Sequence, residues 1–470
     1  MTGDPPEQQP DATPATHAAA PRAPEPDAYA VTSPDHPLAR AEHERGLWAL
    51  LACSAVGVWL IGSPASLGYA WTATGWSEWV SGALAGVLGV VAIHPRRWWA
   101  SWALCALGVW LLFAPLAFGT VHAAAYLNST LSGILLVGLS VIGTRRLWAQ
   151  PVQPGIPPGW SFNPSSWVQR TPIVALAWLC FLISRYLTGY QLDYSGQAWD
   201  PLFGDGTQRV LDSEVAEAWP ISDAGLGAMA YALEALVGCM GGASRWRTAP
   251  WVVALFGVLV VPAGVVSVVL IILQPVAVGA WCTLCLVTAV AMLIMACLTL
   301  PEVAAMMQHL ARSRGPGRSR WQVFWQGGPA PDGQEEVEPV ALTAPPSQVW
   351  RTMVEGVTVP WTLVASLVLG LWIMLSPPIF GMENPGANSH FLAGWLVITV
   401  TVLAMAEVAR PARWVNVLLG GWVIATPWLL AGTADAAQWN AVISGVLLIV
   451  LSIPRGRIAQ QYGTWGRWLV

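Results

Sequence analysis

The chain has 470 residues, of which 55% are hydrophobic and only 10% are charged, and its formal net charge is −4 at pH 7. A soluble globular protein carries about 25% charged residues, so this composition excludes a soluble chain of this length and predicts an integral membrane protein. The slightly acidic balance gives no indication of a nucleic-acid partner.

Residues 1–44 are rich in Ala and Pro and contain no continuous apolar run. Such a segment buries too little apolar surface to offset the entropy of ordering, and it lacks the apolar core of a cleavable secretion signal. We expect a disordered cytoplasmic segment, so membrane insertion depends on the first apolar helix.

Twelve apolar stretches follow that approach or reach the roughly 17–25 residues needed to span a hydrocarbon core. They predict an all-α polytopic membrane protein with about twelve transmembrane helices. The Pro- and Gly-rich residues 150–167 and the longer stretch 311–352 are expected to be linkers, and 458–470 a C-terminal tail. The helices are expected at 47–63, 78–93, 98–115, 127–143, 171–190, 222–241, 249–273, 281–300, 357–376, 389–407, 414–428 and 439–453.

Arginine is distributed unequally between alternate loops. If the N-terminus is cytoplasmic, the loops on the opposite side contain only Arg209 and are otherwise neutral or acidic. Cytoplasmic flanks of transmembrane helices retain positive charge. We therefore predict a multi-pass protein of the cell membrane, surrounded by the lipid bilayer, with both termini in the cytoplasm.

The pattern Gly-x-Trp-x-x-x-x-Pro occurs twice in each of two blocks, 45–149 and 353–457. Each Pro is expected to end the first helix of its unit, a small-residue step in the second helix allows close packing, and the Trp suits the headgroup boundary. The copies are Gly57/Trp59/Pro64, Gly108/Trp110/Pro115, Gly370/Trp372/Pro377 and Gly420/Trp422/Pro427, with steps at Ser81-Gly82, Ser132-Gly133, Ala393-Gly394 and Ser444-Gly445.

These repeats resemble the SPW-repeat membrane family, a helix-hairpin module. Ser63-Pro64-Ala65 and Thr426-Pro427-Trp428 stand where the family shows Ser-Pro-Trp, although only the latter keeps the Trp. The resemblance implies two pairs of two-helix repeats flanking a central block. We expect these pairs to serve packing and lipid anchoring.

Cys282 and Cys285, at the predicted start of the eighth helix, form the strongest chemical motif. Their spacing puts both sulfurs on one face of a helical turn, and the positive end of a helix favours the thiolate that acts in disulfide exchange. The predicted topology puts this turn near the outer face, where disulfides persist. A zinc site would need two more ligands, and the outer loops of the block contain no other Cys or His. Plain buried cysteines are the other alternative.

Three stretches of the central block, 168–310, resemble the vitamin K epoxide reductase family, a four-helix bundle that passes electrons between quinone and thiols. Trp281-Cys282-Thr283-Leu284-Cys285-Leu286 resembles the family's redox turn. The segment from Arg209 to Tyr231, with Trp219-Pro220-Ile221-Ser222, resembles its outer loop and second helix, and Ser184-Arg185-Tyr186-Leu187-Thr188 the outer end of its first helix.

The resemblance implies a membrane thiol-disulfide oxidoreductase that couples oxidation of a thiol protein to reduction of a membrane quinone. Cys285 would face the quinone, of the ubiquinone or menaquinone type, and Cys282 would exchange with the thiol donor; no metal is implied. Because the two cysteines share one turn, we expect them to form a disulfide. The candidate substrate-binding residues are Ser213, Tyr231, Glu234 and Trp281.

The chain departs from the family in its outer loop. Family members carry two further cysteines there, and Thr207 occupies the place of the later one. Three alternatives follow: a separate extracytoplasmic thioredoxin-like protein attacks Cys282 directly, the natural reaction differs from a disulfide relay, or activity has lapsed.

Two intramembrane charges also need an account, because ionisable groups in lipid are expensive. Glu234 is expected to be protonated, paired or facing a polar cavity, and a proton-handling role beside a quinone is one interpretation. Arg185 is close enough to the outer surface to snorkel. The five remaining cysteines stand singly in apolar helices, where they are expected to pack as small hydrophobes.

The oxidoreductase is thus our leading functional hypothesis. The alternative is a non-catalytic membrane scaffold or lipophile-binding protein derived from the same fold, which the missing loop cysteines favour. A transporter ranks third, because the repeats are parallel in topology and lack a polar site at the membrane midplane.

Overall fold

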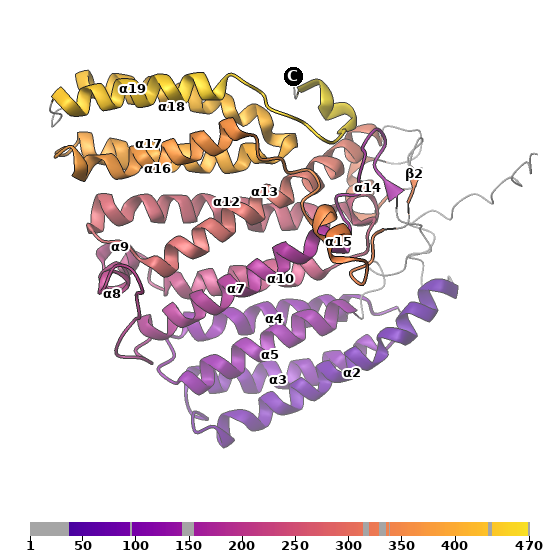
Figure 1. Ribbon diagram of the computed structural model, residues 1–470. Coiled ribbons are helices and arrows are strands. Elements are labelled where there is room, and N and C mark those ends of the chain that lie inside the picture. The colour runs from indigo at the N-terminus through magenta and orange to yellow at the C-terminus, as the bar shows by residue number, and fades with distance from the viewer. Residues whose placement is uncertain are drawn as a thin grey trace, which may run out of the picture.

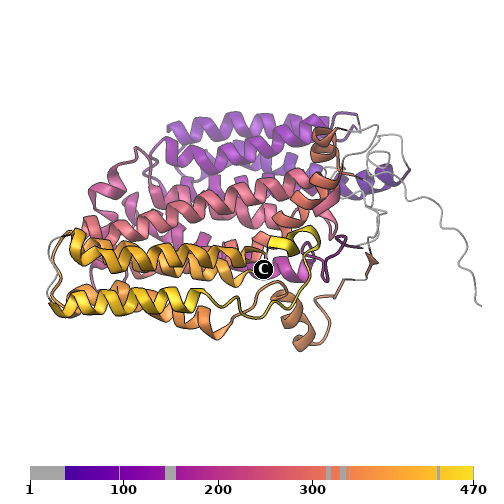
Figure 2. The ribbon, with the colours of Figure 1, turned by 90° about the horizontal axis from the view of Figure 1, so that it is seen from above.

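The computed structural model describes residues 37–94, 96–142, 155–313, 319–328, 335–337, 339–430 and 435–468. Its long helices run side by side, and the connecting segments gather at two opposite ends (Figure 1, Figure 2). We name these the α8 end and the α14 end, after short helices found there. The N-terminal repeat block, the central block and the C-terminal repeat block follow one another across the molecule (Figure 1).

The all-α prediction is confirmed, and every predicted helix corresponds to a long helix of the described chain. The N-terminal repeat block contains α2 (Pro37–Ser66), α3 (Ala73–Ala92), α4 (Trp99–Ala117) and α5 (Ala123–Ile142). The central block contains α7 (Trp167–Gln191), α10 (Asp223–Cys239), α12 (Pro250–Leu273) and α13 (Thr283–Arg312). The C-terminal repeat block contains α16 (Trp361–Ile379), α17 (Gly386–Met405), α18 (Arg413–Leu429) and α19 (Asp435–Ser452).

Two helix boundaries differ clearly from the sequence prediction. Helix α2 begins at Pro37, inside the segment expected to be disordered, because residues 38–45 contain Ala, Leu, Arg and Glu, which favour helix. Helix α13 continues to Arg312, twelve residues beyond the predicted end. Residues 1–36 of the predicted disordered segment lie outside the described residues.

Within the described ranges, nine helices are long and apolar enough to cross a membrane. The other three long helices, α3, α10 and α18, are shorter or less apolar. A multi-pass membrane protein is therefore confirmed, whereas a count of twelve spans stays a prediction.

The short elements lie in the connections. At the α8 end, α8 and α9 precede α10 (Figure 1). The π-helical turn η1 directly continues α12. The two predicted linkers meet, because β1 pairs with β2 in an antiparallel ladder. The bounds are β1 Gly155–Ile156, α8 Gly206–Leu211, α9 Glu214–Glu217, α11 Arg245–Thr248, η1 Gln274–Val278, α14 Arg320–Gln326, β2 Glu335–Glu336, α15 Pro346–Met353, η2 Glu407–Ala412 and η3 Gly463–Trp468.

Each two-helix repeat unit is closed by a contact between two glycines. A Cβ added to Gly82 would lie 2.7 Å from the Gly57 carbonyl oxygen, and one added to Gly57 would lie 2.6 Å from that of Gly82. The same reciprocal contact joins Gly108 to Gly133, Gly370 to Gly394, and Gly420 to Gly445. The first glycine of the pattern and the glycine of the small-residue step therefore form one close helix–helix approach, as small residues do in membranes.

The repeat tryptophans join the two units of each block. Each indole N–H donates to a polar side chain on the second helix of the other unit: Trp59 to Asn128 (2.7 Å), Trp110 to Ser77 (3.0 Å), Trp372 to Asn440 (2.8 Å) and Trp422 to Ser389 (2.9 Å). An unpaired donor is costly where water is absent, so this exchange accounts for the recurring Trp more fully than a headgroup preference.

Glu78 on α3 is a buried charge that the sequence analysis did not single out. Its side chain is fully buried, and its carboxylate accepts hydrogen bonds from Tyr69 (2.8 Å), Asn128 (2.8 Å), Ser129 (2.5 Å) and Ser63 (3.3 Å). All four donors lie in the same repeat block, so the block satisfies this carboxylate internally.

At the α14 end, arginines complete the central block. Arg170 and Arg245 donate to backbone carbonyl oxygens of residues 237–241, in the last turn of α10 and just after it, where a helix leaves carbonyl groups without their usual intrahelical partners. Arg245 also forms a buried ion pair with Glu302 on α13 at 2.6 Å. The chain beyond α19 returns to this end, where the Trp465 indole donates to the Ala304 carbonyl oxygen at 3.0 Å.

Candidate redox site

The Cys282–Cys285 pair lies at the α8 end, where η1 turns into α13. The turn is made by Gly279, whose φ of +67° favours glycine. Cys282 is the N-cap of α13, and its sulfur accepts a hydrogen bond from the Cys285 backbone N–H at 3.1 Å. The two cysteines form a disulfide, with Cα atoms 5.3 Å apart, as their shared turn predicts.

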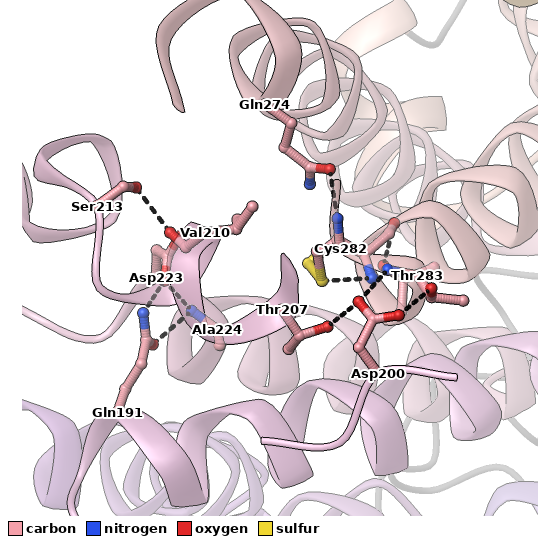
Figure 3. Close-up of a disulfide and its surroundings, with 12 residues drawn as sticks. Gln191, Asp200, Thr207, Val210, Ser213, Asp223, Ala224, Gln274, Cys282 and Thr283 are labelled. Carbon is pink, nitrogen blue, oxygen red and sulfur yellow. Dashed lines mark hydrogen bonds between the residues drawn. A yellow bond between two sulfur atoms is a disulfide. The ribbon is translucent and has the colours of Figure 1, made fainter. Parts of the chain in front are cut away.

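A buried amide fixes the backbone of this turn from the side of η1. The Gln274 side-chain oxygen accepts a hydrogen bond from the Cys282 backbone N–H at 3.0 Å (Figure 3). Gln274 is 3% exposed and Cys282 is 0% exposed. The next residue, Thr283, is held as well. The turn that carries the disulfide is therefore fixed on both sides.

Asp200, in the loop between α7 and α8, holds that next residue. Its carboxylate accepts hydrogen bonds from the Thr283 hydroxyl (2.5 Å) and the Thr283 backbone N–H (3.1 Å) (Figure 3). The Thr207 hydroxyl (2.7 Å) and the backbone N–H groups of Leu202 and Phe203 also donate to it. Asp200 thus supplies, from 83 residues earlier in the chain, the negative cap that a helix N-terminus favours.

The hydrogen bonds explain the ionisation of Asp200. Partial burial raises its pKa, but the bonds from Thr283, Phe203, Thr207 and Leu202 outweigh burial and hold the pKa well below the usual range. Asp200 is therefore charged at any physiological pH, and the loop between Asp200 and Thr207 is tied to the start of α13.

The same loop covers Cys282. A Cβ added to Gly206 would lie 2.1 Å from the Trp281 carbonyl oxygen, so the loop backbone contacts the turn directly. Thr207, at the place of the family's loop cysteine, is fully buried against Asp200. Cys282 is consequently closed off, whereas Cys285 is only partly buried.

Of the predicted substrate-binding residues, Trp281 is the one the structure brings to the turn. Its ring lies between Phe203 of the loop (centroids 6.5 Å apart) and Phe391 of α17 (6.3 Å). Ser213 is set apart, as the N-cap of α9, with its hydroxyl donating to the Val210 carbonyl oxygen at 2.7 Å (Figure 3).

Tyr231 and Glu234 lie on α10, inside the central block. Both are buried, at 6% and 1% exposure. The Tyr231 hydroxyl lies beside Ser267 and Thr288, and the Thr288 hydroxyl donates to the Cys285 carbonyl oxygen at 2.9 Å. Neither carboxylate oxygen of Glu234 has a hydrogen-bond partner among the described residues.

The remaining singled-out residues have mostly structural surroundings. The Arg185 guanidinium lies 4.8 Å from the centre of the Tyr126 ring on α5, and the residue is partly buried. Cys53, Cys105, Cys180 and Cys297 are buried or partly buried, but Cys239 is exposed, contrary to its predicted core packing. In the part of the chain that is described, no group of three or more His, Cys, Asp or Glu residues is arranged to hold a metal ion.

Comparison with known families identifies the two kinds of block. Residues 171–300 match the vitamin K epoxide reductase family, and residues 47–143 and 360–454 match the SPW repeat domain. Both resemblances are confirmed. No curated protein and no solved structure matches the chain.

The fold and the site together define a polytopic membrane protein with a disulfide-bearing turn at one end of its central bundle. In terms of families, it carries a vitamin K epoxide reductase family domain between two SPW repeat domains. The central domain indicates a function of the membrane thiol oxidoreductase kind.

Proposed function

We propose that the protein oxidises the thiols of a second protein and passes the electrons to a membrane quinone. The observation that carries this proposal is the Cys282–Cys285 disulfide, held at the N-terminus of α13 within the vitamin K epoxide reductase family domain. The partner would be an extracytoplasmic, thioredoxin-like dithiol protein, and the quinone would be of the ubiquinone or menaquinone type.

The thiol half-reaction is a disulfide exchange. A thiolate of the partner attacks the Cys282 sulfur, and Cys285 leaves as a thiolate. The second partner thiol then attacks the mixed disulfide, which releases the partner as a disulfide and leaves Cys282 and Cys285 reduced. Since Cys282 is buried beneath the loop from Asp200 to Thr207, this loop must open before the attack.

The second half-reaction restores the disulfide. The quinone accepts two electrons and two protons and leaves as the quinol. Cys285 is suited to face it, because it packs against two apolar clusters, one containing Leu187 and Leu211 and the other containing Ile271. Such apolar walls suit a lipophilic ring.

Glu234 is our candidate for proton handling in this half-reaction. It is a buried carboxylate in the interior of α10, without a partner among the described residues. Tyr231, one turn away on α10, lies beside Thr288, which in turn bonds to Cys285. This polar track supports a proton route between Glu234 and the redox turn.

The charge distribution supports an orientation. Arg170 lies near the start of α7, Arg245 in α11 after the end of α10, and Arg410 in η2 after the end of α17, whereas the redox turn lies at the start of α13. Since cytoplasmic ends retain positive charge, we propose that the α14 end, with both termini, is cytoplasmic. The cysteines would then be near the outer face.

A trapping experiment tests the exchange step and separates it from the scaffold alternative. Cys285→Ser should leave Cys282 able to form a mixed disulfide that cannot be resolved. We expect a reducible band of higher mass on Cys285→Ser and none on the matched control Cys282→Ser. If neither variant traps a partner, and the wild type reduces no quinone with excess dithiol, the protein is a scaffold or lipophile-binding protein.

A further inference from the structure

Helix α17 of the C-terminal repeat block lies along the redox helix α13. The two helices share an apolar cluster in which Ala289 and Leu293 of α13 meet Trp395 and Ile398 of α17, with Cys285 at its edge. A repeat domain therefore borders the cysteine that we propose faces the quinone.

Two contacts define which residues of α13 and α17 are at the same depth. At the α8 end, Trp281 packs edge to face on Phe391, and near the α14 end Cys297 lies beside Ala406. Both helices thus run in the same direction. Trp281 lies just before α13, so Cys285 in the first turn of α13 and Trp395, one turn beyond Phe391 on α17, are at similar depths, and both belong to the shared apolar cluster.

Trp395 carries a buried hydrogen-bond donor without an acceptor. Its side chain is 4% exposed, and its indole N–H has no partner among the described residues. The four repeat tryptophans, in contrast, all donate within their blocks. Because a buried unpaired donor is costly, an acceptor brought by a ligand would relieve this cost.

The repeat itself does not require this tryptophan. The position after the small-residue step is Ala83, Ile134 and Val446 in the other three units. Trp occurs there only in the unit whose second helix packs on α13. The side chain is therefore tied to the contact with the redox helix rather than to the repeat fold.

We propose that Trp395 binds the quinone, donating its indole N–H to a quinone carbonyl oxygen in the seam between α13 and α17. This inference rests on the proposed function and deepens it, because it assigns to a repeat domain part of the quinone site. The donor strengthens binding and stabilises the negative charge that develops on that oxygen during reduction. A phospholipid ester carbonyl has the same acceptor chemistry and is the other source of a partner.

Trp395→Phe tests the proposal, since it removes the N–H and keeps an aromatic ring. The protein is reconstituted into nanodiscs of ether-linked phospholipids, which lack ester carbonyls, and the Kd of a short-chain menaquinone analogue is measured by equilibrium dialysis. We expect the Kd and the KM for the quinone to be about five- to tenfold higher in Trp395→Phe than in the wild type, which is the change that losing one neutral hydrogen bond produces. Trp439→Phe, an exposed position of the same block, is the matched control.

The outcomes separate this inference from the proposed function. If the wild type reduces the quinone and Trp395→Phe leaves both Kd and KM unchanged, the Trp395 assignment is overturned while the oxidoreductase stands. If the wild type binds the quinone in a Trp395-dependent manner without reducing it, the assignment stands and the reaction fails. Absence of both binding and reduction overturns both. The rate at which a dithiol reduces Cys282–Cys285 should be the same in wild type and Trp395→Phe, which reports an intact fold.

Discussion

The two repeat blocks have the same framework and differ at positions that matter for the site. Both close their hairpins by reciprocal glycine contacts and exchange tryptophan hydrogen bonds between units. At equivalent positions before the small-residue step, the N-terminal block has Glu78, held by four donors, and the C-terminal block has His390, whose Nε2 has no partner among the described residues. Shared features therefore report folding, and differences point to function.

The two repeat blocks also differ in where they pack on the central block, and this difference too points to function. The N-terminal block packs on the central block through α4 and α5, where Val137 and Val141 join the central core. The C-terminal block packs on α12 and α13 and contributes Phe391 and Trp395 to the surroundings of the redox turn. The N-terminal block therefore packs on the central bundle away from the redox turn, and the C-terminal block packs beside that turn.

The largest effect should come from the shared glycine contacts. Gly82→Ala and Gly394→Ala each force a Cβ to within about 2.7 Å of a carbonyl oxygen, and such overpacking costs about 1–3 kcal/mol. Unfolding in detergent should show similar losses for both. Gly62→Ala, with open space around the added Cβ, is the control. Equal stability of all three variants would show that the glycine contacts do not hold the hairpins.

A smaller effect, on access rather than stability, is expected at the redox loop. Asp200→Ala removes the acceptor that ties the loop to Thr283, so the loop should open more often. We expect the disulfide to be reduced about tenfold faster by a water-soluble phosphine, equivalent to about 1.4 kcal/mol, as followed by alkylation and mass spectrometry. Asp205→Ala, an exposed carboxylate of the same loop, should leave the rate unchanged. An unchanged rate in Asp200→Ala would mean that other contacts keep Cys282 closed.

Each tryptophan hydrogen bond between repeat units should contribute less to the unfolding free energy than a glycine contact. Trp59→Phe and Trp372→Phe each remove one N–H donor from an equivalent position, at a cost of about 0.5–1.5 kcal/mol. The unfolding free energies should fall by similar amounts in the two variants, with Trp361→Phe, an exposed residue, as control. A cost in only one block would break the equivalence of the two frameworks.

The smallest effect is expected from pH. The pKa of Asp200 is depressed, so its carboxylate stabilises the closed loop fully at any pH above the ordinary Asp pKa near 4. This stabilisation is lost only as the pH falls through the lower pKa of the folded state. The ratio of disulfide reduction rates between Asp200→Ala and wild type should therefore stay constant from pH 5 to pH 8. A ratio that falls towards pH 5 would show that Asp200 becomes protonated in that range.

Much of the fold follows from local sequence signals. Apolar length gave the position of every long helix, and the spacing of Gly, Trp and Pro gave the repeat units. The Cys282–Cys285 disulfide was predictable because both residues belong to one turn. The start of α2 was missed because apolar length does not detect a polar first turn, and the exposure of Cys239 because it depends on how α10 ends.

The candidate site was less predictable, because its contacts join distant parts of the chain. Asp200 bonds to a residue 83 positions later, and Trp59 bonds to one 69 positions later. Neither pattern is periodic. The contact of α17 with α13 depends on the order in which the three blocks pack, and no spacing within either helix indicates it.

The central claim is that Cys282 and Cys285 pass electrons from a dithiol to a quinone. The most direct measurement is the absorbance change of a menaquinone or ubiquinone analogue, with excess dithiol, over purified protein in nanodiscs. We expect reduction by the wild type and only the uncatalysed rate with Cys282→Ser or Cys285→Ser. Equal rates in the wild type and in the double variant Cys282→Ser/Cys285→Ser would contradict the oxidoreductase assignment.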